Sequence, residues 1–319
     1  MKYMIAVDCG GTKTDTVLFD ETGHIHHRDV SAGANGMDIG KAEALRRFLG
    51  TMERVVPLSP GRVSAIYGGI AGVMPLGDFY TPVVAPKDYA DSLRFADDGP
   101  SMISATIGHQ NGCAMVIGTG SSCFIRIDEQ PLRKVGGKGY LIDTGGSGFE
   151  LGRDALAMAF RAADGRCEAT LLTESIQEQM GAPIDQWMER IYDPVSGGRA
   201  FVASFAHHVF EARARGDWAA NDIFDRGAAL LADLTYAAAK WFDGPFPVVM
   251  NGGLVSHFPE YADAIRSRSH PRAIMRLGDA PPVYGSAVEA MWDAGLEADD
   301  MFRARFLADY AALQPPACR

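Results

Sequence analysis

The chain has 319 residues, of which 47% are hydrophobic and 22% are charged, and its formal net charge is -10. This length and composition allow a sizeable core, most often divided between two domains, and exclude an intrinsically disordered protein. The excess of acidic residues, with no block of Lys or Arg, makes nucleic acid and an anionic membrane poor partners.

No targeting or membrane-spanning segment is expected. Met1 is followed at once by a strand-like stretch, MKYMIAV, and no apolar run approaches about 18 residues. The cysteines at positions 9, 113, 123, 167 and 318 are odd in number and lack CxxC spacing, which argues against a disulfide framework or a cysteine zinc site. We therefore predict a cytoplasmic protein with free thiols.

The first half of the chain predicts an α/β domain that begins with a β-meander. Its first three strands are joined by a Gly-Gly turn and by a hairpin turn with a bulge at Gly23. The expected elements, in chain order, are strands at 3–8, 14–20 and 24–30, a helix at 39–56, a strand at 62–72, weak strands at 81–84 and 92–96 around a short helix, and a helix at 100–108.

The second half opens in the same way, with a strand, a Gly-Thr-Gly-Ser turn and two further strands. The elements expected after them are a mostly helical stretch at 147–243, a late strand in FPVVMNGGLV, a helix that starts at Pro281 and Pro282, and a final helix at 297–312. The repeated β-turn-β unit suggests a duplicated domain. We expect one domain over 1–107, joined by helix 297–312, and a second over 108–296 with a helical insertion.

The turn after the first strand has the composition of an anion-binding loop. Gly10 and Gly11 let backbone N–H groups approach an anion closely because glycine has no Cβ, and Thr12 and Thr14 add hydroxyl donors. The loop is not a Walker A motif, in which Gly directly precedes Lys-Ser/Thr, nor a dinucleotide fingerprint, because a strand follows it. A glycine turn alone is most often a plain hairpin. The second turn, GTGS at 118–121, favours a pair of phosphate-binding loops.

Five motifs, in this order and spacing, resemble the N-acetylglucosamine and glucosamine kinases of the BadF/BadG/BcrA/BcrD-type ATPase family. They are DCGGT from Asp8, GTGSSC from Gly118, GGKGYLIDTGGSGFELGRDAL from Gly136, MNGGLV from Met250 and YGSAVEAM from Tyr284. The resemblance spans nearly the whole chain. It implies the sugar kinase, heat-shock-70 and actin superfamily, an α/β fold in which two ribonuclease-H-like (actin-like ATPase) domains enclose a nucleotide cleft.

The resemblance implies ATP and Mg²⁺ as cofactors. In the family, DCGGT is the first phosphate loop, GTGSS is the second, and NGG with the YGSA helix encloses the adenosine. The nucleotide-binding residues implied in this way are Gly10, Gly11, Thr12, Lys13, Gly118, Thr119, Gly120, Ser121, Gly252, Gly253, Gly285 and Ser286. Asp8 is the candidate partner of Mg²⁺, through water because that ion keeps much of its hydration. The alternative for Asp8 is an Asp that starts a turn.

A kinase of hydroxyl groups needs a base, which the resemblance places at a strand-to-helix junction about twenty residues before the GTG turn. FADDGPSMISATIG offers Asp97 and Asp98, and both the distance to Gly118 and the following Gly99 favour Asp98. Asp97 would then be a solvated neighbour. The alternative for both residues is a helix cap before PSMIS.

The resemblance also implies a sugar pocket, formed by Asn35, Asp98, Ser122, Gly137, Lys138, Asp143 and Thr144. Asn35 matches the family's sugar-contacting asparagine, although Asn-Gly is also a plain turn. Two departures flank this pocket. GGKG at 136–139 stands where relatives have Gly-Gly-Trp-Gly, and TGGS at 144–147 stands where they have Asp-Glu-Gly-Ser or Asp-Gln-Gly-Ser, with Asp143 one position early. Losing a carboxylate pair changes specificity strongly, so the sugar stays open among N-acetylglucosamine, glucosamine, muramic acid and other hexose derivatives.

The histidine pairs at 26–27 and 207–208 lack the further ligands that support a metal site, and solvated or capping roles are expected for them.

We predict an ATP-dependent kinase that phosphorylates the 6-hydroxyl of an amino sugar, N-acetylglucosamine or glucosamine, with Asp98 as the base. The resemblance also implies a homodimer. Two other classes stay open. Related ATPases activate dehydratases and reductases through an iron–sulfur cluster that bridges two subunits, for which Cys123 and Cys167 are candidate ligands, and iron in the purified protein would favour this class. A non-catalytic nucleotide- or sugar-binding regulator is supported only by the altered sugar pocket.

Overall fold

The computed structural model describes residues 1–11, 13–128, 130–143, 145–193 and 196–313. The chain forms two compact units, Met1–Gln110 with Gly278–Arg319, and Asn111–Leu277. In the described residues each unit holds one five-stranded sheet with helices packed on it, so the α/β class predicted from the sequence is confirmed.

The sheet of the first unit has the strand order β3-β2-β1-β4-β5. Its strands are β1 (Tyr3–Cys9), β2 (Lys13–Asp20), β3 (Ile25–Ala32), β4 (Val63–Ile70) and β5 (Ala90–Ala96). Strands β1 to β3 form an antiparallel meander, and β4 and β5 run parallel to β1. The carboxyl ends of β1, β3, β4 and β5 therefore lie along one edge of the sheet, where open α/β sheets bind their ligands.

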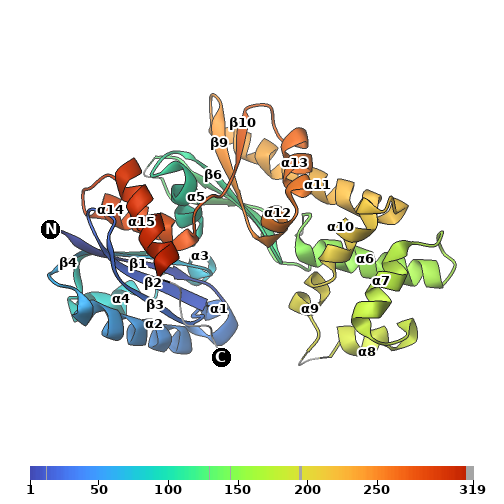
Figure 1. Ribbon diagram of the computed structural model, residues 1–319, viewed down its shortest axis with the longest axis horizontal. Helices are drawn as coiled ribbons and strands as arrows, with labels where there is room; N and C mark the ends of the chain where they lie inside the picture. The colour runs from blue at the N-terminus through green and yellow to red at the C-terminus, as the bar shows by residue number, and fades with distance from the viewer. Residues whose placement is uncertain (12, 129, 144, 194–195, 314–319) are drawn as a thin grey trace. The chain divides into compact units, whose positions relative to one another are not determined.

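Successive side chains of β1 enter two different cores because side chains alternate across a strand. Met4 and Ala6 pack with α14 (Pro282–Asp293) and α15 (Asp300–Ala312). Ile5 and Val7 pack with α2 (Lys41–Val55). Figure 1 shows α2 on one face of this sheet and α14 and α15 on the other. The remaining short helices of the unit are α1 (Gly36–Ile39), η1 (Val56–Leu58), α3 (Val73–Leu76), α4 (Thr81–Val84), η2 (Ala85–Lys87) and α5 (Gly99–Ile107).

The sheet of the second unit has the order β10-β9-β6-β7-β8. Its strands are β6 (Gly112–Ile117), β7 (Ser121–Arg126), β8 (Arg133–Val135), β9 (Phe246–Asn251) and β10 (Ala273–Leu277). β9 and β10 run parallel to β6, whereas β7 is antiparallel to it. The turn after β6 and the turn after β9 therefore lie at the same edge.

All the described helices of the second unit follow β8. They are α6 (Gly148–Ala163), α7 (Leu171–Met180), η3 (Ile184–Gln186), α8 (Trp187–Ile191), α9 (Arg199–Ala203), α10 (Ala206–Ala214), α11 (Trp218–Ala238), η4 (Ala239–Trp241), α12 (Gly253–His257) and α13 (Pro259–Arg268). Fully buried Trp187, Phe205, Phe224 and Tyr261 belong to the core between these helices and the sheet. Within the described part of the chain, every helix is too short or too polar to cross a membrane.

The structure corrects three sequence-based expectations. The weak strand at 81–84 is helix α4, because Pro82 starts a helix well and the Asp78 side chain accepts hydrogen bonds from the backbone of Tyr80 and Thr81. Strand β10 was not predicted, since this edge strand is mostly exposed and lacks alternation. Finally, α14 had been placed in the second domain, yet it is buried against β1, β4 and α5 of the first unit.

Candidate functional site

The edge at the carboxyl ends of β1, β4 and β5 gathers the acidic residues predicted for the first unit. In the register of the sheet, Asp8 is the partner of Gly69, and Gly69 is the partner of Ala96. Asp97 and Asp98 follow directly after Ala96. Because neighbouring strands lie about 4.8 Å apart, these carboxyl groups belong to one edge of one sheet.

The Gly10–Gly11 turn lies at the same edge and is held tightly. The N–H of Gly10 donates to the carbonyl of Lys13 at 2.9 Å. Gly33, just after β3, has no room for a Cβ because the carbonyl oxygen of Gly11 occupies that position. The end of β3 therefore touches the turn and fixes it. Thr12, the third predicted residue of this turn, lies outside the described residues, and Lys13 opens β2 with an exposed side chain.

Asp8 carries an unusually basic carboxyl group. Its pKa is raised from 3.8 to about 7, mainly by burial and also by the negative charge of Asp15, whereas Lys13 opposes the shift. Asp15 is directly opposite Asp8 in the antiparallel pair and stays close to Arg28, which holds both of its oxygens at 3.0 and 2.7 Å. The buried Asp15 was not predicted as part of the site, because its effect depends on cross-strand register.

The two candidate bases differ in exposure from what the sequence suggested. Asp98 is partly exposed and occupies the position before α5, without a side-chain capping hydrogen bond. Asp97, which was expected to be solvated, is only 7% exposed. Pro100 lies in the first turn of α5, where its fixed φ favours the start of a helix.

Asn35 follows β3 and lies at this edge as predicted, but its side chain already has a structural partner. Its Oδ1 accepts a hydrogen bond from the N–H of Met37 at 2.9 Å and so caps α1. An added Cβ at Gly72, just after β4, would lie 2.7 Å from the same oxygen. Asn35 is thus packed against the end of β4, and its contact with a sugar stays a prediction.

In the second unit, the Gly118–Ser121 hairpin is anchored to the start of α6. The N–H groups of Gly148 and Phe149 donate to the carbonyls of Gly118 and Thr119 at 2.8 and 3.1 Å. The Ser121 hydroxyl donates to the carbonyl of Gly145 at 2.9 Å. These bonds give the turn a fixed conformation before any ligand binds.

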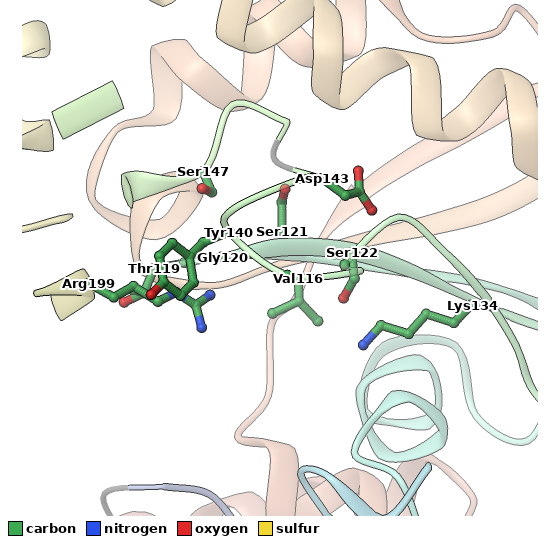
Figure 2. Close-up of a pocket in the computed structure, with 13 residues that line it drawn as sticks. Val116, Thr119, Gly120, Ser121, Ser122, Lys134, Tyr140, Asp143, Ser147 and Arg199 are labelled. Carbon is green, nitrogen blue, oxygen red and sulfur yellow. The ribbon is translucent and has the colours of Figure 1, made fainter. Parts of the chain in front are cut away.

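A pocket of about 320 Å³ opens over this turn. Figure 2 shows Arg199 and Lys134 approaching the turn from opposite sides. The lining residues are Val116, Gly118, Thr119, Gly120, Ser121, Ser122, Lys134, Gly137, Gly139, Tyr140, Asp143, Ser147 and Arg199. The structure thus brings together the predicted phosphate turn and three of the predicted sugar residues, Ser122, Gly137 and Asp143.

Lys138 and Thr144 were also predicted as sugar residues. Lys138 is outside the pocket lining and contributes its backbone N–H, which donates to Oδ2 of Asp143 at 2.9 Å. Thr144 lies outside the described residues. The Lys138–Asp143 bond closes a short loop and turns the carboxyl group of Asp143 back toward the glycines.

Sequence analysis did not identify the two cationic residues of this pocket, Lys134 and Arg199. The Arg199 guanidinium fills the space beside the α-carbon of Gly120, so a Cβ there would overlap it. Neither side chain forms an ion pair with a carboxylate among the described residues, so both charges are available to an anion. Arg199 lies about 80 residues after the turn, and no local motif marks it.

A second pocket, of about 240 Å³, shares Gly118 and Thr119 with the first. Its other lining residues are mainly apolar: Gly148, Ala203, Ser204, Ala206, His207, Gly253, Leu254, His257 and Phe258. The predicted Gly253 is among them, and Gly252 has a φ of 119° and packs directly on Ile117. Nδ2 of Asn251, the last residue of β9, is buried without a hydrogen-bond partner among the described residues.

The predicted adenosine contacts Gly285 and Ser286 are not at either pocket. Ser286 is fully buried, and its hydroxyl donates to the carbonyl of Val7 at 2.9 Å. Gly285 packs on the backbone of Ser101 with no room for a Cβ. The small residues of YGSA therefore allow α14 to approach β1 and α5 closely, which explains the motif by packing.

Comparison with known proteins agrees with this architecture. The model of the BadF/BadG/BcrA/BcrD ATPase family matches residues 5–276. An N-acetyl-D-glucosamine kinase from Dictyostelium discoideum is 25% identical over 316 residues, which cover 91% of this chain and 98% of the relative. An N-acetylmuramic acid/N-acetylglucosamine kinase from Clostridium acetobutylicum is 28% identical over 182 residues, 55% of this chain and 59% of the relative.

A solved structure from Chromobacterium violaceum, provisionally assigned as an N-acetylglucosamine kinase, has a TM-score of 0.64. It is 23% identical and covers 90% of this chain and 98% of its own, which shows the fold. The two-domain actin-like ATPase fold expected from the sequence is thereby confirmed. The family match, which extends from β1 through β10, establishes that the chain belongs to the BadF/BadG/BcrA/BcrD ATPase family.

Proposed function

We propose that the protein is an ATP-dependent amino-sugar kinase that transfers the γ-phosphoryl group to the 6-hydroxyl of N-acetylglucosamine or glucosamine. The observation that carries this proposal is the composition of the pocket over the Gly118–Ser121 turn. The glycines of the turn, with Arg199 and Lys134, suit a phosphate group. The Ser122 hydroxyl and the Asp143 carboxylate line the same pocket and suit a sugar. The relatives named as N-acetylglucosamine kinases support the substrate class.

In this proposal, the two pockets of the second unit bind different parts of the nucleotide. The mainly apolar pocket beside Gly253 suits a nucleoside, and the shared residues Gly118 and Thr119 suit the phosphates that follow it. Such transfer depends mostly on positioning and on neutralising charge at the γ-phosphate. Arg199 and Lys134 supply that charge in the second unit.

Asp8 fits the role of the Mg²⁺ partner, because a carboxylate oxygen at the end of a strand is a ligand type that Mg²⁺ prefers. When bound, Mg²⁺ neutralises phosphate charge and orients the phosphates. The raised pKa of Asp8 suits this role, since a carboxyl group held near Asp15 gains from a nearby cation.

We assign general-base catalysis to Asp98, which would accept the proton of the sugar hydroxyl. It is partly exposed and follows β5 at the same edge as Asp8. Asn35 and Asp143 are the proposed sugar contacts. Asp143 lies one position before the carboxylate of the relatives, and this shift would affect the choice of sugar.

The rival iron–sulfur ATPase class has little support from the cysteines. A cluster that bridges two subunits needs ligands at a surface, yet Cys123 is fully buried in β7. Of the four cysteines that the structure describes, only Cys167 is partly exposed.

An assay of ADP release with a panel of amino sugars, with and without Mg²⁺, tests the proposal. A kinase releases ADP only when both Mg²⁺ and an accepted sugar are present. Release that is independent of every sugar, accompanied by iron in the purified protein, would instead show the ATPase class. Binding without any turnover would show a regulator.

A further inference from the structure

Helix α10 carries three potential metal ligands that converge on one point. His207, His208 and Glu211 each direct one ligand atom into a cluster whose atoms all lie within 4.8 Å of one another. Nε2 of His207 is 3.9 Å from one oxygen of Glu211, and Nδ1 of His208 is 3.7 Å from the other. These distances are too long for hydrogen bonds. The cluster belongs entirely to the second unit, where α10 packs on α6 and α7 (Figure 1).

The ring of His207 is fixed in one tautomer by the backbone. Its Nδ1 lies 2.8 Å from the carbonyl oxygen of Ser204, which can only accept a hydrogen bond. Nδ1 therefore carries the proton, and Nε2 presents a free lone pair toward Glu211. Donation of the second ring N–H to a backbone carbonyl is the usual arrangement of a metal-binding histidine.

A chain of three hydrogen bonds fixes His208 as well. The Ser204 hydroxyl donates to the carbonyl of Phe201 at 2.7 Å, so its oxygen accepts from the side-chain amide of Gln179 at 3.1 Å. This orientation directs the amide oxygen of Gln179 at Nε2 of His208, 2.7 Å away. Nε2 must then carry the proton, which leaves Nδ1 as the atom with the lone pair.

Nδ1 of His208 is buried and has no hydrogen-bond partner among the described residues. Its side chain is only 6% exposed, so water does not reach it freely. An unpaired buried acceptor is costly, and this lone pair, like that of the more exposed His207, faces a carboxylate. A cation at the centre of the cluster would replace mutual repulsion by three favourable contacts.

We propose that His207, His208 and Glu211 bind a divalent transition-metal ion of the Zn²⁺ class. Two imidazoles and one carboxylate are a ligand set that Zn²⁺ accepts, and an oxygen-preferring ion such as Mg²⁺ does not favour it. Tetrahedral zinc ligands lie about 3.3 Å from one another, so the ligand atoms, which now lie within 4.8 Å of one another, must move closer together. The exposed side chains of Glu211 (61%) and His207 (40%) can move toward the fixed, buried His208.

The sequence alone predicted a solvated or capping role for this pair, because no further metal ligands were recognised beside it. The orientation of the pair depends on Ser204, in the turn just before α10, and on Gln179, which comes from α7. Gln179, on α7, is the positioning residue, since it sets the tautomer of His208.

Calorimetric titration of the chelator-treated protein with Zn²⁺, together with the visible spectrum of the Co²⁺ form, tests this site. We expect one ion bound per chain, and millimolar Mg²⁺ should not displace it. Glu211→Gln and His207→Gln should each weaken binding by roughly 100-fold or more, because loss of an outer partner alone costs about 10- to 100-fold. Gln179→Leu should weaken Zn²⁺ binding by about 10- to 100-fold.

His24→Gln is the matched control. His24 is also a half-exposed histidine, 4.8 Å between ring centroids from His26 and 2.6 Å from a carboxylate oxygen of Asp309. This variant should retain wild-type affinity for Zn²⁺. Absence of stoichiometric binding, unchanged affinity in both Glu211→Gln and His207→Gln, or displacement by Mg²⁺ would each overturn the proposal.

Discussion

At the scale of single residues, the proposed chemistry depends on which carboxylate after β5 accepts the proton. Asp98→Asn keeps the shape of the side chain but removes its basicity, so turnover should fall by roughly 10² to 10⁴ while ATP and sugar still bind. Steady-state kinetics with N-acetylglucosamine and glucosamine measures this split between kcat and KM.

Asp97→Asn is the comparison for this experiment. Asp97 is 7% exposed, so its substitution should act through stability and packing at the junction before α5, with kcat little changed in the folded protein. Loss of kcat in Asp97→Asn with normal turnover in Asp98→Asn would move the base by one residue. Normal kcat in both variants would contradict base catalysis from this junction.

The carboxyl group of Asp8 gives a pH-dependent prediction. Its pKa is about 7 in the folded chain, mainly through burial, against an ordinary value of 3.8. Between these pH values the folded state binds more protons than the unfolded state, so this group lowers the free energy of unfolding as the pH rises. Asp8→Asn should therefore raise the free energy of unfolding by roughly 1–3 kcal/mol at pH 8 and change it little at pH 4.

Urea unfolding of the wild type and of Asp8→Asn at both pH values measures this difference. The same variant should lose Mg²⁺-dependent activity, because Asp8 is the proposed partner of Mg²⁺. Asp8 would then be a residue that lowers stability and is kept for function. Asp91→Asn, at an exposed surface pair with Arg62, is the control and should show neither effect. A variant that is less stable than the wild type at pH 8 would contradict this interpretation of Asp8.

Arg199 was not identified from the sequence, and the structure places it in the proposed phosphate site. Its guanidinium lies against Gly120 in the lining of the first pocket. A charge-assisted hydrogen bond to phosphate contributes about 1.5–3 kcal/mol, so Arg199→Met should raise the KM for ATP by roughly tenfold or more. Arg166→Met, which removes an exposed arginine paired with Asp164, should leave that KM unchanged. Equal KM values for the two variants would show that Arg199 does not bind the nucleotide.

At the scale of elements, the turn between β1 and β2 depends on its neighbour Gly33. Any Cβ at this position overlaps the carbonyl of Gly11, so Gly33→Ala must displace the turn. We expect ATP affinity to fall roughly tenfold, the equivalent of about one hydrogen bond. Gly50→Ala, inside α2 with space around the new Cβ, should bind ATP normally and unfold at a slightly higher temperature. Binding titrations on both variants, after circular dichroism confirms folding, decide the matter. Wild-type affinity in Gly33→Ala would mean that the turn is not a phosphate loop.

Elements with strong local signals could be predicted from the sequence. Alternating apolar residues predicted the meander β1 to β3. Gly23 indicated the turn between β2 and β3, and its φ is 84° in the structure. The strand register shifts before this turn, between Leu18 and Phe19. By contrast, α4 contains two valines in succession, and their preference for strands is outweighed by Pro82 and the capping Asp78. β10 is stabilised by its pairing with β9, and its own residues carry no clear strand pattern.

At the scale of the whole molecule, the sequence predicted the two sheets, the two glycine turns and the return of helix 297–312 to the first domain, but not the individual contacts between distant segments. The chain returns to the first unit at residue 278, and Ser286 meets Val7 across 279 positions. Arg199 and Lys134 enter the pocket from separate elements in the same way. Such contacts follow from the packing of complete units, so no local pattern in the chain indicates them.

The central claim is that the protein esterifies the 6-hydroxyl of an amino sugar. The most direct measurement is the ³¹P and ¹H NMR spectrum of the product formed from ATP, Mg²⁺ and N-acetylglucosamine or glucosamine. The account predicts a phosphomonoester whose phosphorus couples to the two protons on C6, formed by the wild type and nearly absent with Asp98→Asn. Inorganic phosphate without any sugar ester, or an ester at another carbon, would contradict it.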